Sequence, residues 1–165
     1  MLKEKLQADV KEALKSGNSQ KRTLLGMVLS AVKNREFDKR AKVSKTTGET
    51  DAVKLDEAAK LNDEEVLETI ASEIKKRKDS VEQFEKGGRP ELAAQENQEI
   101  DILKAYMPEQ MSDDAVMAEV KKAIAETGAS GPKDMGKVIG AVMAKIKGKA
   151  DGTLVSRFVK EELSK

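Results

Sequence analysis

The chain has 165 residues, of which 37% are charged and only 2% are aromatic. It contains no cysteine and no histidine, which excludes disulfides, thiolate metal sites, cysteine nucleophiles and the most common general base. Its formal net charge of +1 means that attraction to a polyanion would have to come from a local basic surface.

The first third of the chain is predicted to be helical. Apolar residues recur every four positions from Leu2 to Leu14, and Gly17 ends that helix. A second helix begins near Asn18. From about Lys39 to Lys60 the apolar spacing fades, and the stretch KTTGET within it is predicted to be an exposed loop with the weakest order of the chain.

A long helical hairpin follows. Asn62 and Glu65 have the spacing of a capping box at the start of a helix. This helix ends at the glycine pair 87–88. Pro90 suits the first turn of the next helix, which reaches Tyr106. The two helices are predicted to lie antiparallel about the glycine turn.

A domain boundary is predicted where Pro108 disfavours a helical conformation of the residue before it. Three amphipathic helices follow, at about 112–126, at 132–147 and from Asp151 onwards. We therefore predict an all-α fold, with an N-terminal helical domain at 1–107 that contains the long hairpin and a small three-helix domain at 112–165.

Arg77 interrupts the apolar face of the first hairpin helix, and Glu96 interrupts that of the second. In an antiparallel hairpin about Gly88, Arg77 falls opposite Glu99, which predicts a buried or half-buried arginine–carboxylate pair. Two interpretations stay open: a salt bridge that fixes the hairpin, or a small polar site for a ligand or RNA. No nucleophile accompanies these residues, so we predict no catalytic residue, no metal site and no cofactor.

The C-terminal part of the chain concentrates positive charge. Between Gly131 and Lys160 there are seven basic and two acidic residues, which favours RNA or another polyanion as a partner. The candidate RNA-binding residues are Lys133, Lys137, Lys145, Lys147, Lys149 and Arg157. The alternative is that lysines near a helix C-terminus stabilise the helix dipole, which accounts for Lys145 and Lys147 but not for the others.

Two further features bear on RNA binding. Gly136, Gly140 and Ala144 form a ridge of small residues, for which we expect close packing of a second helix or, alternatively, close approach of a nucleic-acid backbone. The aromatic residues that could stack on bases are Phe37, Phe84, Tyr106 and Phe158, of which two or three are expected in the core.

The N-terminal stretch MLKEKLQADVKEALK lacks the apolar core of a signal peptide. No segment approaches the ~20 apolar residues that span a bilayer. These observations predict a cytoplasmic protein with no membrane partner.

Two segments, 75–108 and 131–163, resemble the GatB/YqeY family. The resemblance rests on KKRKDS, GR-x-x-L, E-x-x-E-I, YMP, DMGKVIG and KGKADG, which occur in this order. The family includes stand-alone YqeY-like proteins and the C-terminal tail of the B subunit of glutamine-dependent tRNA amidotransferases. The segment Lys39–Lys60 is expected to depart from the family pattern.

The resemblance implies a two-part, all-helical fold. In the amidotransferase subunit the tail helps to grip tRNA, which would place the phosphate-facing region around Lys133, Lys137, Lys147, Lys149 and Arg157. We expect a non-catalytic protein that binds tRNA or another structured RNA. The alternatives are a helical adaptor for a protein of the tRNA-amidation machinery and, less favoured, a carbon–nitrogen ligase with glutamine as amido donor.

Overall fold

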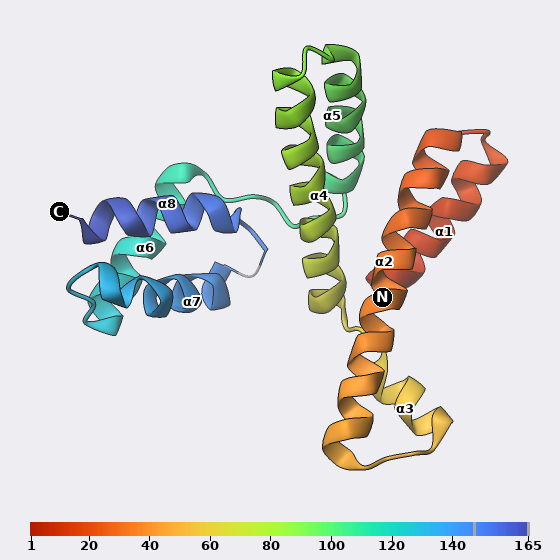
Figure 1. Cartoon of the computed structure of the whole chain (residues 1–165), viewed down its shortest axis with the longest axis horizontal. Coiled ribbons are helices and arrows are strands. Elements are labelled where there is room, and N and C mark those ends of the chain that lie inside the picture. The colour runs from red at the N-terminus through yellow and green to blue at the C-terminus, as the bar shows by residue number, and fades with distance from the viewer. Residues whose placement is uncertain (147, 165) are drawn as a thin grey trace. The chain divides into compact units, whose positions relative to one another are not determined.

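The computed structural model describes residues 1–146 and 148–164, and every regular element within them is a helix (Figure 1). The predicted all-α class is confirmed. In chain order the elements are α1 (Leu2–Lys15), α2 (Ser19–Thr47), α3 (Ala52–Ala59), α4 (Asp63–Lys86), α5 (Pro90–Lys104), α6 (Asp113–Thr127), the 3₁₀ turn η1 (Pro132–Asp134), α7 (Met135–Ile146) and α8 (Gly152–Leu163). They divide into two compact units, Met1–Tyr106 and Met107–Lys165.

Helices α2, α4 and α5 begin where the sequence predicted them. The Asn18 side chain accepts a hydrogen bond from the N–H of Lys21 at the start of α2. At the start of α4, Asn62 and Glu65 exchange two hydrogen bonds of 2.8 and 2.9 Å in a capping box. Pro90 occupies the first turn of α5, where its missing N–H costs nothing.

The core of the first unit is aliphatic. Helices α1 and α2 form one hairpin, α4 and α5 form a second, and α4 packs against both α1 and α2 (Figure 1). The largest side chains that are fully buried in this unit are Leu6, Leu24, Leu25, Val28, Val32, Val66, Ile70 and Leu103. Burying each such side chain stabilises the fold by roughly 1.5–3 kcal/mol relative to exposing it.

Ion pairs join the basic helix α2 to the acidic start of α4. The Lys39 ammonium lies 2.8 Å from a Glu65 carboxylate oxygen. The Arg35 guanidinium lies 2.9 Å from Glu68 and donates a further hydrogen bond of 3.0 Å to the Thr69 hydroxyl. Charge complementarity therefore sets which face of α2 meets α4.

The predicted loop KTTGET is shorter in the structure, because only its second half, from Gly48 to Thr50, lies outside a helix. Helix α2 continues to Thr47, and α3 begins after Asp51, whose side chain accepts from the N–H of Lys54. The Asp56 carboxylate and the Arg40 guanidinium lie 2.8 Å apart at an angle that makes no hydrogen bond, and this ion pair links α3 to α2. Caps and contacts between helices thus replace the missing apolar periodicity.

The second unit is a three-helix arrangement of α6, α7 and α8 around its own core. The buried residues of this core are Val116, Val120, Ala123, Val138, Val142, Ile146, Val155, Phe158 and Val159. The helix predicted from Pro132 begins as a 3₁₀ turn, and the α-helix starts at Met135. The last helix, predicted from Asp151, begins at Gly152, and Asp151 caps it by accepting from the N–H of Thr153 at 2.8 Å. Within the described residues, no helix combines the length and the apolar character that crossing a membrane requires.

Independent folding of the second unit stays a prediction. We expect residues 107–165, produced alone, to give a helical far-UV circular dichroism spectrum and a cooperative thermal transition, because the buried core residues all lie within that segment. Its stability should be modest, since a unit this small buries a low fraction of its surface. A segment without helical signal would show that the second unit depends on the first.

Candidate nucleic-acid interface and buried ionic cluster

Arg77 lies inside the α4–α5 hairpin with its side chain only 7% exposed. Its Nε donates a hydrogen bond of 2.9 Å to Glu99 of α5. Its Nη1 donates to the Glu73 carboxylate at 3.0 Å and to the Glu73 carbonyl at 3.1 Å. The guanidinium therefore bridges two carboxylates from two helices, and its charge is compensated on both sides.

Sequence reasoning missed Glu73. The available signal was its position four residues before Arg77, because glutamate and arginine at this spacing meet on one helix face. Glu73 is itself buried, and its second oxygen lies 2.6 Å from the exposed ammonium of Lys76. The described residues thus contain a small ionic cluster made of Glu73, Lys76, Arg77 and Glu99.

The carboxylates of this region have different electrostatic environments. Burial alone would raise the pKa of Glu73, but hydrogen bonds from Lys76 and Arg77 outweigh it and hold this pKa below its ordinary value. Burial and the neighbouring charge of Glu99 raise the pKa of Glu96, and Arg77 offsets this only in part. Across the described ranges, no three acidic groups lie where they could hold a metal ion.

We predict that Arg77→Ala lowers the free energy of unfolding by about 3–5 kcal/mol, because it leaves two carboxylates without their buried partner. Urea denaturation followed by circular dichroism measures this. The matched control is the adjacent Lys76→Ala, whose side chain is 68% exposed and whose loss should cost at most about 1 kcal/mol. Equal stabilities of the two variants would contradict a buried role for Arg77.

We expect Glu96→Gln to raise the free energy of unfolding at neutral pH. An acid whose pKa is raised in the folded state weakens the fold when it is ionised, and this penalty disappears as the pH falls through the raised pKa towards the ordinary value of 4.5. The gain over wild type should therefore be present at pH 7 and vanish at about pH 4.

Glu73→Gln is the control for the pH experiment, because the pKa of Glu73 is lowered rather than raised. It should weaken the fold at neutral pH, and its deficit should shrink as the pH falls below the ordinary value. A Glu96→Gln variant that is less stable than wild type at pH 7 would mean that the Glu96 charge is favourable in the fold.

The predicted basic residues of the second unit are exposed but are not equivalent. The Lys145 ammonium pairs with Glu126 of α6. The Lys137 ammonium donates a hydrogen bond of 2.9 Å to the carbonyl of Thr127 at the end of α6. The carboxylate of Glu126 compensates the charge of Lys145, whereas the neutral carbonyl of Thr127 orients Lys137 and leaves it its net charge.

Arg157 projects from α8 on the side away from the core, with its guanidinium 3.8 Å from Glu161 and 5.1 Å from the ring of Phe158. Lys133 and Lys149 are exposed, and no ion pair to either occurs among the described residues. Lys147 lies outside the described residues. The five described candidates therefore do not share one helix face.

The outer face of α7 carries a row of small residues. A Cβ atom added to Gly136 or Gly140 would meet nothing within 4 Å, and Ala144 is exposed. The expectation that these small residues permit close packing of another helix is wrong for the described residues. Lys133 precedes α7 and Lys149 follows it in the chain, and both are exposed, so a cation flanks each end of this helix.

Only one of the four aromatic residues is strongly exposed. Tyr106 and Phe158 are buried, each 8% exposed, whereas Phe37 is 54% exposed. The Tyr106 hydroxyl donates to the Asp9 carboxylate, which ties the end of the second hairpin to α1. Phe37 on α2 is therefore the aromatic ring most open to a planar ligand.

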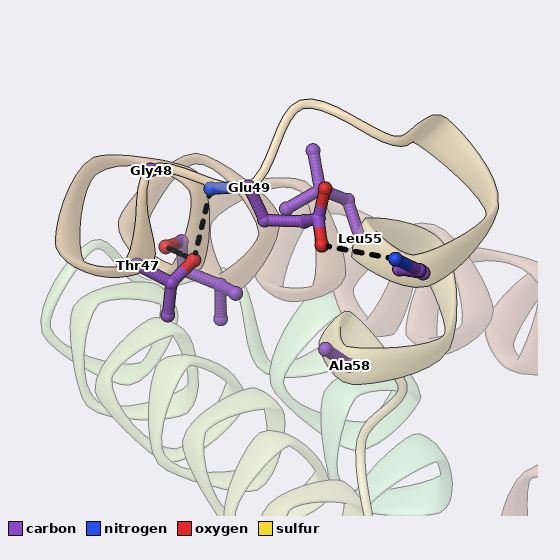
Figure 2. A pocket seen from close by; sticks show the side chains of 7 residues that line it. Thr47, Gly48, Glu49, Leu55 and Ala58 are labelled. Atoms are coloured by element: carbon purple, nitrogen blue, oxygen red, sulfur yellow. Dashed lines mark hydrogen bonds and ion pairs between the residues drawn. The ribbon is translucent and has the colours of Figure 1, made fainter.

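A small open hollow of about 410 Å³ lies beside the end of α2, and Figure 2 shows Glu49 at its edge. It is lined by Val43, Thr47, Gly48, Glu49, Lys54, Leu55 and Ala58. Backbone N–H groups of Asp51 and Thr50 donate to the Glu49 carboxylate and lower its pKa, and Lys54 lies 3.6 Å away. The Glu49 carboxylate and the Lys54 ammonium at this hollow thus neutralise each other.

Fold and site together define a class: an all-helical protein of two compact units, with an internal ionic cluster and exposed basic helix faces. The sequence matches the family model described as Yqey-like protein over residues 3–163. The chain belongs to this family. The matched range includes the segment from Lys39 to Lys60, whose expected departure from the family pattern stays a prediction.

Relatives with the name "Altered inheritance of mitochondria protein 41, mitochondrial" occur in several fungi. The Lachancea thermotolerans protein is 30% identical over 129 residues, which cover 77% of this chain and 60% of that protein. The Pyrenophora tritici-repentis protein is 28% identical over 159 residues, which cover 95% of this chain and 78% of that protein. A Saccharomyces cerevisiae relative is 32% identical over 103 residues, which cover 62% of this chain and 46% of that protein.

These comparisons correct the predicted location. Three of the matched relatives, from Lachancea thermotolerans, Pyrenophora tritici-repentis and Candida glabrata, are named as mitochondrial proteins. The prediction of a cytoplasmic protein is therefore wrong. The chain spans about 60% of the first of these relatives and 48% of the third.

Proposed function

We propose that this protein binds structured RNA, with tRNA as its ligand, through the outer face of α7, and that it does so without catalysis. The observation that carries the proposal is a pair of exposed lysines, Lys133 and Lys149, which form no ion pair among the described residues and flank α7, whose exposed Gly136 and Gly140 have open space around them. Lysines of this kind contact phosphates, and a bare helix face lets a phosphate backbone come close.

The chemistry of the surface favours backbone contacts over base recognition. A lysine ammonium is a point charge that binds any phosphate, so affinity would depend strongly on salt and weakly on sequence. Lys137 can join the contact, because its hydrogen bond to a carbonyl at the end of α6 leaves the positive charge of the ammonium uncompensated by a carboxylate. Lys145 is less available, because Glu126 competes with any phosphate.

The choice of tRNA among RNAs rests on the resemblance to the amidotransferase tail, which grips tRNA. In that arrangement the chain would present tRNA to a separate enzyme of the amidation machinery. The ionic cluster around Arg77 is better suited to a structural role than to RNA binding, since the guanidinium is engaged by Glu73 and Glu99.

We predict salt-dependent binding of bulk tRNA to the full chain, measured by filter binding between ~50 and 200 mM salt. If Lys133, Lys137 and Lys149 contact phosphates, the slope of log affinity against log salt should lie between about −2.1 and −2.7. Changing Lys133 and Lys149 together to Gln should make the slope shallower by about 1.4–1.8, because two phosphate contacts are lost.

The matched control changes Lys75 and Lys76 on α4, which are exposed lysines of the other unit. This variant should keep the wild-type slope, and both variants should keep the wild-type far-UV spectrum because the side chains are exposed. An absence of tRNA binding by the wild-type protein at ~50 mM salt would refute the proposal and leave the adaptor for a protein partner as the better explanation.

A further inference from the structure

Helix α2 carries more positive charge than the first unit neutralises. It contains eight basic and two acidic residues. Arg35, Lys39 and Arg40 lie in ion pairs with α3 or α4. The exposed basic residues of α2 that form no ion pair among the described residues are Arg22, Lys33, Lys42 and Lys45. Asp38 is the one exposed acid along the same described helix.

Four of the exposed residues of α2 form a continuous ridge. Lys33, Phe37, Ala41 and Lys45 are spaced four apart, and all four are exposed. Residues at this spacing lie next to one another on a helix surface. The ridge faces away from the residues that α2 buries, which are Leu24, Leu25, Val28 and Val32, and the exposure of all four ridge residues shows that no other helix of the first unit covers it.

The centre of the ridge presents an aromatic ring beside a cation. The Lys33 ammonium lies 5.6 Å from the centre of the Phe37 ring, at a distance suited to a cation–π contact. This contact restrains the ring, which is 54% exposed. The next residue of the ridge, Ala41, has too little bulk to cover the ring.

An exposed ring flanked by cations is the combination that single-stranded nucleic acid recognises. Bases stack on the ring face whatever their sequence, and lysines on either side hold the adjoining phosphates. The two cations of the ridge lie 12 positions apart, or about 18 Å along the helix, which is room for more than one nucleotide. An acidic protein helix would satisfy the cations but would gain nothing specific from the planarity of Phe37.

We propose that the ridge Lys33–Phe37–Ala41–Lys45 is a second RNA-binding surface, on which an unpaired base stacks against Phe37 while Lys33 and Lys45 contact phosphates. This proposal rests on the proposed function, because it assigns to the same RNA a single-stranded contact on the first unit in addition to the phosphate contact on α7. Two sites on one RNA would reinforce each other through their effective concentration.

The sequence offers a direct probe, because the chain contains no tryptophan. Phe37→Trp in the full chain places the only indole at the centre of the ridge, where a stacked base quenches its emission. We expect tRNA and oligouridylate to quench Trp emission in this variant. Met27→Trp is the matched control, because Met27 is 53% exposed on the same helix but lies outside the ridge, and its emission should change little.

Affinity gives the second measurement. Phe37→Leu keeps an apolar side chain but removes the stacking face, and it should weaken oligouridylate binding at least about fivefold, whereas Met27→Leu should not. Changing Lys33 and Lys45 together to Gln should make the salt slope shallower by about 1.4 for a single strand. Because these side chains are exposed, the far-UV spectrum should stay that of wild type.

The outcomes separate this proposal from the function proposed above. If RNA binds and the α7 variant weakens it, but Phe37→Trp is not quenched and Phe37→Leu binds as wild type does, the ridge proposal fails alone. If quenching occurs and the α7 variant binds as wild type does, the α7 surface fails and the ridge stands. Quenching by polyglutamate and not by RNA would overturn the ridge proposal in favour of an acidic protein partner.

Discussion

The first unit depends on the way Arg77 is neutralised between Glu73 and Glu99. With almost no aromatic residues, the chain builds its core from aliphatic side chains, and the α4–α5 hairpin holds a guanidinium where such a side chain would otherwise lie. A buried charge is tolerated only when its partners are in place. The guanidinium of Arg77 joins Glu73 of α4 to Glu99 of α5, so it lies where the two helices meet.

The same principle explains which basic residues remain for function. Helix α2 uses Arg35 and Lys39 to bind the acidic start of α4, and α7 uses Lys145 to bind α6. Cations that form ion pairs within the fold therefore alternate along these helices with cations that are exposed to solvent. Net charge near zero therefore conceals two exposed basic surfaces, one in each unit.

Much of the fold could be predicted from the sequence, because its helices begin at clear caps and its turns contain glycine. Counting outward from Gly88 was enough to place Arg77 opposite Glu99. The extent of α2 could not be predicted, because its last turns are held by contacts with α3 that leave no apolar period. The open face of Gly136 and Gly140 was missed for a related reason: composition shows that a residue is small but not whether a neighbour fills the space.

The hydrogen bond between Tyr106 and Asp9 has a spectroscopic consequence. Tyr106 is the single tyrosine of a chain that has no tryptophan, and burial and the Asp9 carboxylate raise its pKa. Ultraviolet emission of the natural protein therefore reports only on the first unit, at the junction of α1 with the end of the second hairpin. The second unit contributes phenylalanine alone, and its melting is invisible to tyrosine fluorescence.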